Sequence, residues 1–433
     1  MLLLSCITGA ARANGRFPQA QAIESTPGRG DVLFLRTTFG ILVSRDAGLS
    51  WQWICERALG YEGQWDPPIA VTRDGRLWVG LPNGLASTAD GCAVDFVPEL
   101  AGETIKDLTV DARGDVLYAI VGAPGKRAAV FRKKDRWERL ASKGLDDLNL
   151  LTIEVAPTRD TRIYVSGEPY DTVRGRLYRS DDGGQSFSGT PNALAAEGPF
   201  FIAAVDAEDP NRLVLRHLHA AGSDLLLTTD AGKTFQNVLA MKSAMFGFAK
   251  GKDKKTFFAA SGLAADGVFR STDRGATFQR VSSHGVLCLH GNAAGLFACE
   301  NVFALGGPAI AASADDGASF RSLARFADIK GPISCGPSAS NDAGARLCGD
   351  AWAETLASVS PRPDAGAPPA IEDAGAVPSP PKPKSSCSCR VGGASNAPDP
   401  TWLIAVSGPL SLRWRRRARM DRRVTKPTSS EGL

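Results

Sequence analysis

The sequence predicts an all-β protein: a β-propeller of seven blades, each a sheet of four antiparallel strands, with eight blades as the alternative. The first observation behind this fold class is a turn motif that recurs at intervals of about 45 residues. The second is the series of short, apolar or alternating segments between the copies, which is typical of strands. No segment sustains a helical period. In a chain of 433 residues, of which 43% are hydrophobic, such strands can bury a large core.

The repeated motif reads Ser/Thr-x-Asp-x-Gly-x-x-aromatic. In a hairpin loop its Asp accepts hydrogen bonds from backbone N–H groups, and its Gly takes a positive φ that other residues resist. The aromatic residue, on the strand that leaves the turn, points into the packing between neighbouring sheets. The aspartates of the clear copies, to which we assign a structural role, are Asp46, Asp182, Asp230, Asp273 and Asp315.

Two further units complete the repeat. A degenerate copy begins at Ser87, where the Asp has moved out of register. The interval after it is about twice the others, because residues 115–121 and 129–137 have the strands of another unit without its loop motif. Seven units result. After them, a hairpin at 331–335 and 345–348 is expected either to close the ring or to begin an eighth blade.

Over residues 16–350 these motifs resemble the Asp-box, or BNR-repeat, propeller superfamily, which includes sialidases, sortilin-type receptors, xyloglucanases and photosystem assembly factors. The resemblance implies a fold and no particular activity, because the Asp boxes of these families lie on the rim, away from the active site. For a sialidase-like enzyme it implies an arginine triad, an acid/base Asp and a Tyr–Glu pair at the central mouth. The Arg-Ile-Pro motif of such enzymes has only a faint echo, in Gly15-Arg16-Phe17-Pro18.

The sequence predicts no catalytic, cofactor-binding or metal-binding residue and no cofactor. The nearest approach to a catalytic group is Glu168-Pro169-Tyr170-Asp171, where a carboxylate stands close to a phenol. All four residues belong to one loop, whereas a propeller active site draws on several blades. We interpret the segment as an ordinary polar loop on one face of the propeller.

Two histidines and a group of tryptophans have both a structural and a functional interpretation. His217 and His219 lie on the same face of a strand and could share a metal, but Leu213 and Leu215 precede them on that face. Histidines that flank the core or are exposed are therefore favoured. The tryptophans could stack on sugars, yet packing between blades explains most of them: Trp51, Trp53, Trp65 and Trp78.

The chain begins like an exported protein. Residues 1–10 form a short apolar run, and Ala11-Arg12-Ala13 follows it with the small-x-small pattern of signal-peptidase cleavage. The signal peptide is expected at 1–13, so that the mature protein begins at Asn14. No basic region precedes the apolar run, which leaves open a start upstream of Met1.

The cysteines agree with export, because disulfides form in oxidising compartments. The pairing of sequence neighbours is one of many connectivities that six cysteines allow. No pair has the Cys-x-x-Cys spacing of the simplest zinc and redox motifs. The expected pairs are Cys55–Cys92, Cys288–Cys299 and Cys335–Cys348.

The C-terminal part departs from the composition of the propeller, which we assign to residues 14–357. Residues 358–386 are rich in Pro and Ala and are expected to form a disordered, semi-rigid spacer. In 387–433, Cys387 and Cys389 precede a short apolar run and an Arg-rich cluster. This order resembles the C-terminal sorting tag of myxobacterial surface proteins, which implies anchoring through the cysteine motif and association with a membrane. The apolar run is shorter than the roughly 20 residues of a full span.

The charge distribution excludes a nucleic-acid surface. The formal net charge of +4 arises from the Arg-rich end, whereas nucleic-acid binding needs a basic stripe on the folded domain. We therefore expect an exported, monomeric, cell-surface propeller that acts as a non-catalytic binding module for a protein or carbohydrate partner. The alternative is a secreted sialidase-like glycoside hydrolase. Carboxylates and arginines from several blades that converge at the centre of the ring would favour the enzyme.

Overall fold

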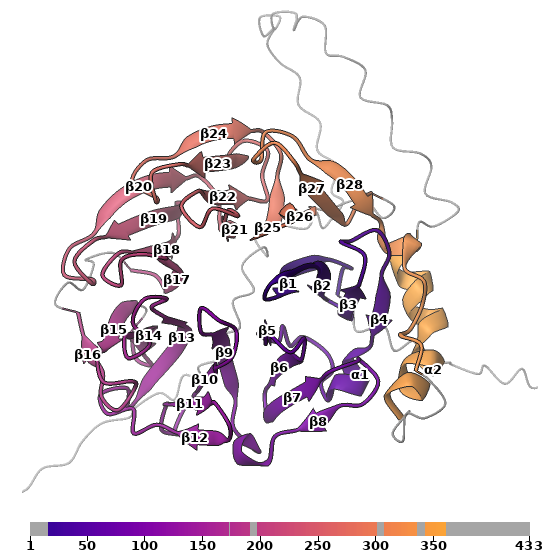
Figure 1. The fold of residues 1–433 in the computed structure, drawn as a ribbon, viewed down its shortest axis with the longest axis horizontal. Helices are drawn as coiled ribbons and strands as arrows, with labels where there is room; N and C mark the ends of the chain where they lie inside the picture. The colour runs from indigo at the N-terminus through magenta and orange to yellow at the C-terminus, as the bar shows by residue number, and fades with distance from the viewer. Residues whose placement is uncertain (1–15, 173, 191–196, 301–306, 336–342, 361–433) are drawn as a thin grey trace, which may run out of the picture. The chain divides into compact units, whose positions relative to one another are not determined.

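The computed structural model describes residues 16–172, 174–190, 197–300, 307–335 and 343–360. All of them belong to the first of two compact units, Met1–Gly366; the second, Ala367–Leu433, lies outside the described residues. Seven four-stranded antiparallel sheets stand around a common axis, as Figure 1 shows. The prediction of an all-β propeller with seven blades is confirmed.

Each blade consists of four consecutive strands, counted from the axis outward. Blades 1 to 3 are β1 (Ala20–Thr26), β2 (Arg29–Thr37), β3 (Gly40–Ser44) and β4 (Gln52–Ile54); β5 (Ile69–Val71), β6 (Leu77–Leu81), β7 (Gly84–Thr88) and β8 (Asp95–Phe96); and β9 (Ile105–Val110), β10 (Leu117–Val121), β11 (Ala129–Lys133) and β12 (Trp137–Arg139). Blades 4 and 5 are β13 (Leu148–Val155), β14 (Ile163–Pro169), β15 (Arg176–Ser180) and β16 (Ser188–Gly189); and β17 (Phe200–Val205), β18 (Leu213–His219), β19 (Gly222–Thr228) and β20 (Gln236–Met241). Blades 6 and 7 are β21 (Met245–Lys250), β22 (Phe257–Ser261), β23 (Val268–Ser271) and β24 (Gln279–Ser282); and β25 (Val286–Asn292), β26 (Gly295–Glu300), β27 (Ile310–Ser313) and β28 (Arg321–Ala324). Two 3-10 turns, η1 (Pro98–Leu100) and η2 (Phe326–Asp328), follow blades 2 and 7.

Burial within a blade follows the packing of sheet against sheet. The middle strands β6, β7 and β22 are buried along their whole length, and their sequences are continuous runs of small and apolar residues. The innermost strand β17 alternates instead between buried and partly exposed residues. One side of such a strand therefore lies in the core, while the other borders the axis.

The five motif aspartates occupy turns between the third and fourth strands of their blades. In blade 5, the Asp230 carboxylate accepts hydrogen bonds from the Thr234 N–H at 2.9 Å, the Thr234 hydroxyl at 2.6 Å and the Thr228 hydroxyl at 2.8 Å. The Thr228 oxygen accepts in turn from the Gly232 N–H at 2.9 Å. The same bonds recur around Asp46, Asp182, Asp273 and Asp315.

Two successive residues of each turn lie in the left-handed region, and not the Gly alone. In blade 5 the φ angle is 61° at Ala231 and 87° at Gly232. A Cβ on Gly232 would also come within 2.8 Å of Leu177 and Thr190 of blade 4, so both the backbone angle and the neighbouring blade require Gly. The residues that correspond to Ala231 in the other turns are Ala47, Gly183, Arg274 and Asp316.

Among the described residues, every blade is built from four consecutive strands, so the ring closes without an exchanged strand. β1 contacts β25 near the axis. The chain that leaves blade 7 runs back along the outer strand of blade 1, where Trp53 N–H donates to the Gly331 carbonyl at 2.8 Å and Ile333 N–H donates to the Trp53 carbonyl at 2.9 Å. The first half of the expected hairpin therefore extends blade 1 and does not begin an eighth blade.

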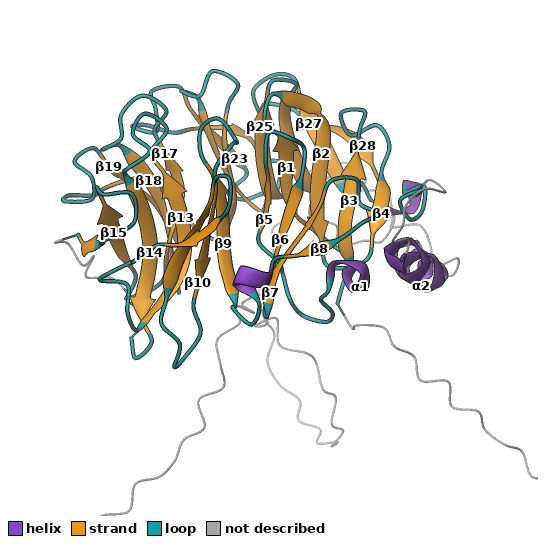
Figure 2. Ribbon diagram, turned by 60° about the horizontal axis from the view of Figure 1, so that its bottom comes forward, coloured by secondary structure: helices purple, strands orange, loops and turns teal. Residues whose placement is uncertain are grey.

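The second half of that expected hairpin is wrong, because residues 345–348 lie in the helix α2 (Ala343–Val359). α2 also contradicts the expectation that no segment sustains a helical period, since Cys348, Trp352 and Val359 fall on its less exposed stripe. It packs beside the short helix α1 (Glu56–Leu59) at the outer edge of blade 1 (Figure 2). The helix ends two residues beyond 357, where the propeller was expected to end.

Three disulfides join the described cysteines. Cys288 and Cys299 pair as expected, because they are facing residues of β25 and β26 with Cα atoms 4.8 Å apart. This disulfide lies within one hairpin, where neighbours in sequence are also neighbours in space.

The other two expected pairs, Cys55–Cys92 and Cys335–Cys348, are wrong. Cys55 bonds to Cys348, and Cys92 bonds to Cys335. Ring closure is the reason, since the segment after blade 7 returns to the first two blades and brings cysteines from the two ends of the described chain together.

Candidate functional site

Charged side chains from several blades meet around the axis of the ring. Glu24 on β1, Asp107 on β9 and Glu154 on β13 lie on the innermost strands of blades 1, 3 and 4. Asp107 Oδ2 accepts a hydrogen bond from the Ile153 N–H at 3.0 Å, and Glu154 Oε2 accepts one from the Thr109 hydroxyl at 3.4 Å. Each of these two carboxylates is thus held against the neighbouring blade.

These three residues, here called the axial carboxylates, are poorly hydrated although each retains some solvent exposure. Burial, followed by the charges of Glu154 and Asp107, raises the pKa of Glu24 to about 8. Burial raises the pKa of Asp107 to about 7, against the hydrogen bond from Ile153. Burial also raises the pKa of Glu154. The group therefore retains protons at a pH where a surface carboxylate is fully ionised.

Cations balance part of this charge. Arg36 on β2 and Lys250 on β21 oppose the rise in the pKa of Glu24 through their charges. Further round the ring, the guanidinium of Arg216 lies 4.8 Å from the centre of the Phe201 ring. Carboxylates and cations from several blades therefore do converge around the axis.

A recess of about 610 Å³ is lined by residues of blade 4 and of the segment that leads into blade 5. Tyr170 is 39% exposed there and shares the recess with Arg174, Arg176, Asp171 and Glu197. The turns that hold the motif aspartates, here called the Asp turns, join the third and fourth strands of their blades. The recess lies at the opposite end of the blades, because its Tyr170 lies between the second and third strands and successive connections in an antiparallel sheet alternate between its two ends.

The structure divides the segment from Glu168 to Asp171. Glu168, at the end of β14, accepts a hydrogen bond from Asn149 Nδ2 at 3.3 Å, and burial raises its pKa. Tyr170 and Asp171 line the recess instead. Tyr170 and Asp171 thus lie in a polar loop as the sequence suggested and form one wall of the recess, whereas Glu168 and Pro169 belong to the strand β14.

The two predicted histidines have a third partner. His217 is buried, its ring stacks on Phe200 with centroids 4.6 Å apart, and burial lowers its pKa. The ring of His219 lies 5.2 Å from that of His217. Asp224 faces His217 across the β18–β19 hairpin, and the ligand atoms of the three residues all lie within 4.8 Å of one another. The interpretation as core-flanking histidines fits His217. It did not include Asp224, which completes the group.

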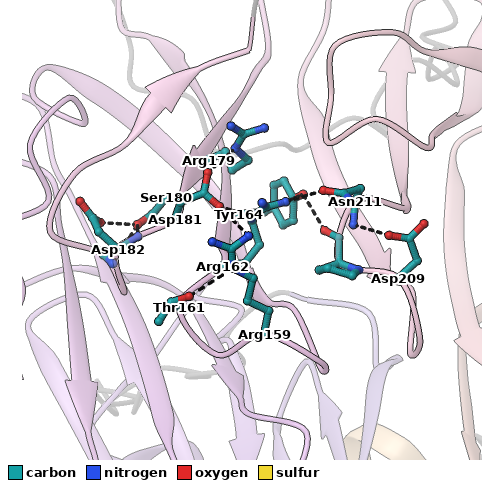
Figure 3. Close-up of polar contacts among 12 residues, drawn as sticks. Arg159, Thr161, Arg162, Tyr164, Arg179, Ser180, Asp181, Asp182, Asp209 and Asn211 are labelled. Atoms are coloured by element: carbon teal, nitrogen blue, oxygen red, sulfur yellow. Dashed lines mark hydrogen bonds and ion pairs between the residues drawn. The ribbon is translucent and has the colours of Figure 1, made fainter.

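Three arginines converge within blade 4, away from the axis. Figure 3 shows Arg159, Arg162 and Arg179 around the Asp181 carboxylate: Arg179 is 3.0 Å and Arg159 is 3.6 Å from it, and Arg162 Nε donates a hydrogen bond to it. Arg162 also donates to Asn211 Oδ1 of blade 5 at 2.8 Å. The cluster ties two blades together at the Asp-turn end, so its position differs from that of the triad that a sialidase resemblance implies.

The tryptophans of the first two units are packing residues. Trp78 makes an edge contact with Trp137 of the next blade, with centroids 5.8 Å apart, and Trp53 packs against Trp352 of α2. Each indole N–H donates to an oxygen within the propeller, and the four residues that do so are Trp51, Trp53, Trp65 and Trp78.

The predicted signal peptide at 1–13, nearly all of the spacer and the whole tail with Cys387 and Cys389 lie outside the described residues. In the part of the chain that is described, no helix is both long and apolar enough to cross a membrane. The three disulfides are typical of a protein that folds in an oxidising compartment.

Comparison with known proteins supports the fold. No protein-family model matches the chain, and no curated protein matches its sequence. Among solved structures, an ancestral GH74 enzyme has a TM-score of 0.50 at 13% identity over 71% of this chain and 46% of its own. The GH74 enzyme of Niastella koreensis gives 0.32 at 13% over 73% and 65%, and YCF48 from Cyanidioschyzon merolae gives 0.43 at 14% over 65% and 92%.

This chain spans less than two thirds of the length of the first GH74 structures that it matches. At such identities the likeness shows a shared β-propeller fold alone. A fold by itself assigns no activity, so both functions that the sequence left open remain candidates.

Sequence reasoning missed the axial carboxylates and Asp224. Each axial carboxylate is the single acidic residue of an otherwise ordinary strand, and no motif marks it. Asp224 had a usable signal: a short turn after His219 places it opposite His217 in an antiparallel hairpin. Strand pairing within the blade would therefore have found it.

Proposed function

We propose that this chain is an exported, cell-surface binding module whose partner, a glycan or a protein segment, docks in the recess between blades 4 and 5. The observation that carries the proposal is the exposed ring of Tyr170 in a recess with Arg174 and Arg176. An aromatic face offers stacking, and guanidinium groups offer paired hydrogen bonds. Together they suit a sugar or peptide that carries a carboxylate or sulfate group.

Binding measurements on the purified full chain test this assignment. We expect the wild type to retain acidic oligosaccharides or acidic peptides from an array, and Tyr170→Ala and Arg176→Ala to weaken that binding at least about tenfold. Arg127→Ala is the matched control, because Arg127 is 79% exposed and pairs with Asp146 at the surface. Equal binding by the two recess variants and the control would place the partner elsewhere.

Export and anchoring form a second part of the proposal. The apolar start, the Cys–apolar–Arg order of the tail and the oxidised cysteines support a mature protein that begins near Asn14 and is held at the cell surface through the region of Cys387 and Cys389. Intact-mass analysis of material from native cells tests both processing events. A full-length species in the cytoplasm would refute them.

Glycoside hydrolysis is the second candidate function, and the axial carboxylates favour it. Glu24, with a pKa of about 8, keeps its proton at neutral pH, as a general acid must. Asp107 and Glu154 come from other blades, as a propeller active site requires. A panel of fluorogenic sialosides and other glycosides tests this function. Turnover that Glu24→Gln or Glu154→Gln abolishes, while Tyr170→Ala preserves it, would replace the binding module by an enzyme.

A further inference from the structure

We propose that His217, His219 and Asp224 form a binding site for a divalent transition metal, with Zn²⁺ as the best-suited ion. The three residues belong to one hairpin: the histidines lie on β18, and Asp224 lies on β19 directly opposite His217. This site is independent of the recess proposal and of any catalytic activity.

The spacing of the ligand atoms fits a metal. Asp224 Oδ2 lies 3.4 Å from His219 Nε2 and 3.9 Å from His217 Nδ1. Zinc bonds of about 2.0–2.2 Å in a tetrahedral site place ligand atoms about 3.4 Å apart. Small side-chain rotations are therefore enough to bring the three atoms to bonding distance.

The surroundings of His217 orient its ring so that Nδ1 can bind a metal. Its Nε2 lies 3.2 Å from the Glu197 carbonyl oxygen, which can only accept a hydrogen bond. The proton therefore belongs on Nε2, and the lone pair of Nδ1 is free on the side of Asp224. Metal-binding histidines are commonly oriented by such a bond to a backbone carbonyl. Gly198 permits this contact, because a Cβ there would come within 3.0 Å of His217 Nε2.

The second imidazole supplies an independent sign of a missing ligand. His219 Nε2 is a buried atom with no hydrogen-bond partner among the described residues, since its 3.4 Å contact with Asp224 Oδ2 is not a hydrogen bond. A buried polar atom without a partner is costly. A metal ion shared with Asp224 and His217 would satisfy it.

Two imidazoles and one carboxylate are the donor set that suits zinc and its neighbours in the first transition series. Three protein ligands also leave one position of a tetrahedral zinc open for water or a donor atom of a bound partner. The Glu197 carbonyl that orients His217 belongs to a residue of the recess wall, so a partner in the recess lies near this hairpin.

The test uses the full chain in a Cys387→Ser/Cys389→Ser background, which removes the tail thiols as competing zinc ligands. Chelator-treated protein is titrated with Zn²⁺ alone by calorimetry and with Co²⁺ alone by visible absorption. We expect one ion per chain and cobalt bands of tetrahedral character, with binding at least about tenfold weaker in His219→Ala and Asp224→Asn.

His284→Ala is the matched control. The side chain of His284 is 37% exposed, against 26% for His219, and it pairs with Glu300 at 2.8 Å. The control should bind as the parent does. Thermal melts without metal establish that each variant is folded, and His217 is left intact because it is buried against Phe200. Stoichiometry near zero, equal affinity in all three variants, or a loss in His284→Ala as large as in the others would each overturn the site.

Discussion

The disulfide between Cys55 and Cys348 joins the outer edge of blade 1 to the helix that follows blade 7. A second disulfide, Cys92–Cys335, links the same returning segment to blade 2. Within the described chain, blades 1 and 7 also meet through side-by-side packing, through hydrogen bonds such as that between Ser25 and His290, and through the short backbone pairing at Trp53, all of which are noncovalent. The covalent bonds therefore act as the latch of the ring.

The latch predicts a large stability effect. Cys55→Ser/Cys348→Ser should lower the free energy of unfolding by about 2–5 kcal/mol, because the disulfide closes a long loop of the unfolded chain. Urea denaturation measures this loss. Cys288→Ser/Cys299→Ser is the control with a sequence separation of only 11 residues, against 293 for the latch, and should cost less. An unchanged free energy of unfolding in Cys55→Ser/Cys348→Ser would show that this disulfide is dispensable.

The Asp turns predict acid sensitivity. Burial opposes the shift, but hydrogen bonds from Thr234 and its neighbours lower the pKa of Asp230 to about 2, and the Ser319 hydroxyl and N–H lower that of Asp315 to about 2. A carboxylate with a depressed pKa stabilises the fold above its unfolded pKa, and the stabilisation is lost as the pH falls through the folded value. The melting temperature should therefore drop between about pH 4 and pH 2. In Asp230→Asn this drop should be shallower, and an unchanged slope would contradict the assignment.

The axial carboxylates predict a pH dependence of stability opposite to that of the Asp turns. The pKa of Glu24 is raised to about 8, so its contribution to stability is complete below about pH 4.5 and is lost as the pH rises through 8. Glu24→Gln removes this charge and keeps the shape. We expect the variant to melt at a higher temperature than the wild type at pH 8.5 and to differ little at pH 5. A lower melting temperature at pH 8.5 would show that the ionised carboxylate is needed.

The cluster around Asp181 predicts that its arginines contribute unequally to the free energy of unfolding. The side chain of Arg162 is only 7% exposed and bridges blade 4 to Asn211, whereas that of Arg159 is 46% exposed. Arg162→Met should cost about 1–3 kcal/mol of unfolding free energy, since it leaves polar partners unpaired. Arg159→Met should cost less than about 1 kcal/mol. Chemical denaturation of the two variants decides, and equal losses would refute the bridging role.

Local chemistry made the blades predictable. The Asp turn needs only a carboxylate, a hydroxyl and a Gly within a few residues, so Asp230 and its counterparts announce a hairpin wherever they occur. Even the degenerate copy that begins at Ser87 still holds its turn, because Asp90 accepts hydrogen bonds from the N–H groups of Cys92 and Ala93 at 2.8 and 3.1 Å. A regular spacing of such hairpins is enough to establish a ring.

Contacts that depend on ring closure could not be predicted in this way. The partner of Cys55 is 293 residues away because the last segment returns to the first blade, and proximity in sequence pointed to Cys92 instead. The axial carboxylates meet for the same reason. The helix α2 was a different failure: its stripe of Cys348, Trp352 and Val359 was present in the sequence, but residues 345–348 were interpreted as half of a hairpin.

The latch also imposes an order on biosynthesis. Cys55 and Cys92 leave the ribosome long before Cys335 and Cys348, and no partner from the native pairing exists until the last segment has been made. In an oxidising compartment the two early thiols have time to react with each other or with small disulfides. Reaching the native pairing then requires thiol–disulfide exchange. The yield of correctly closed rings should thus depend on a disulfide isomerase, whereas the hairpin disulfide Cys288–Cys299 can form as soon as its own strands emerge.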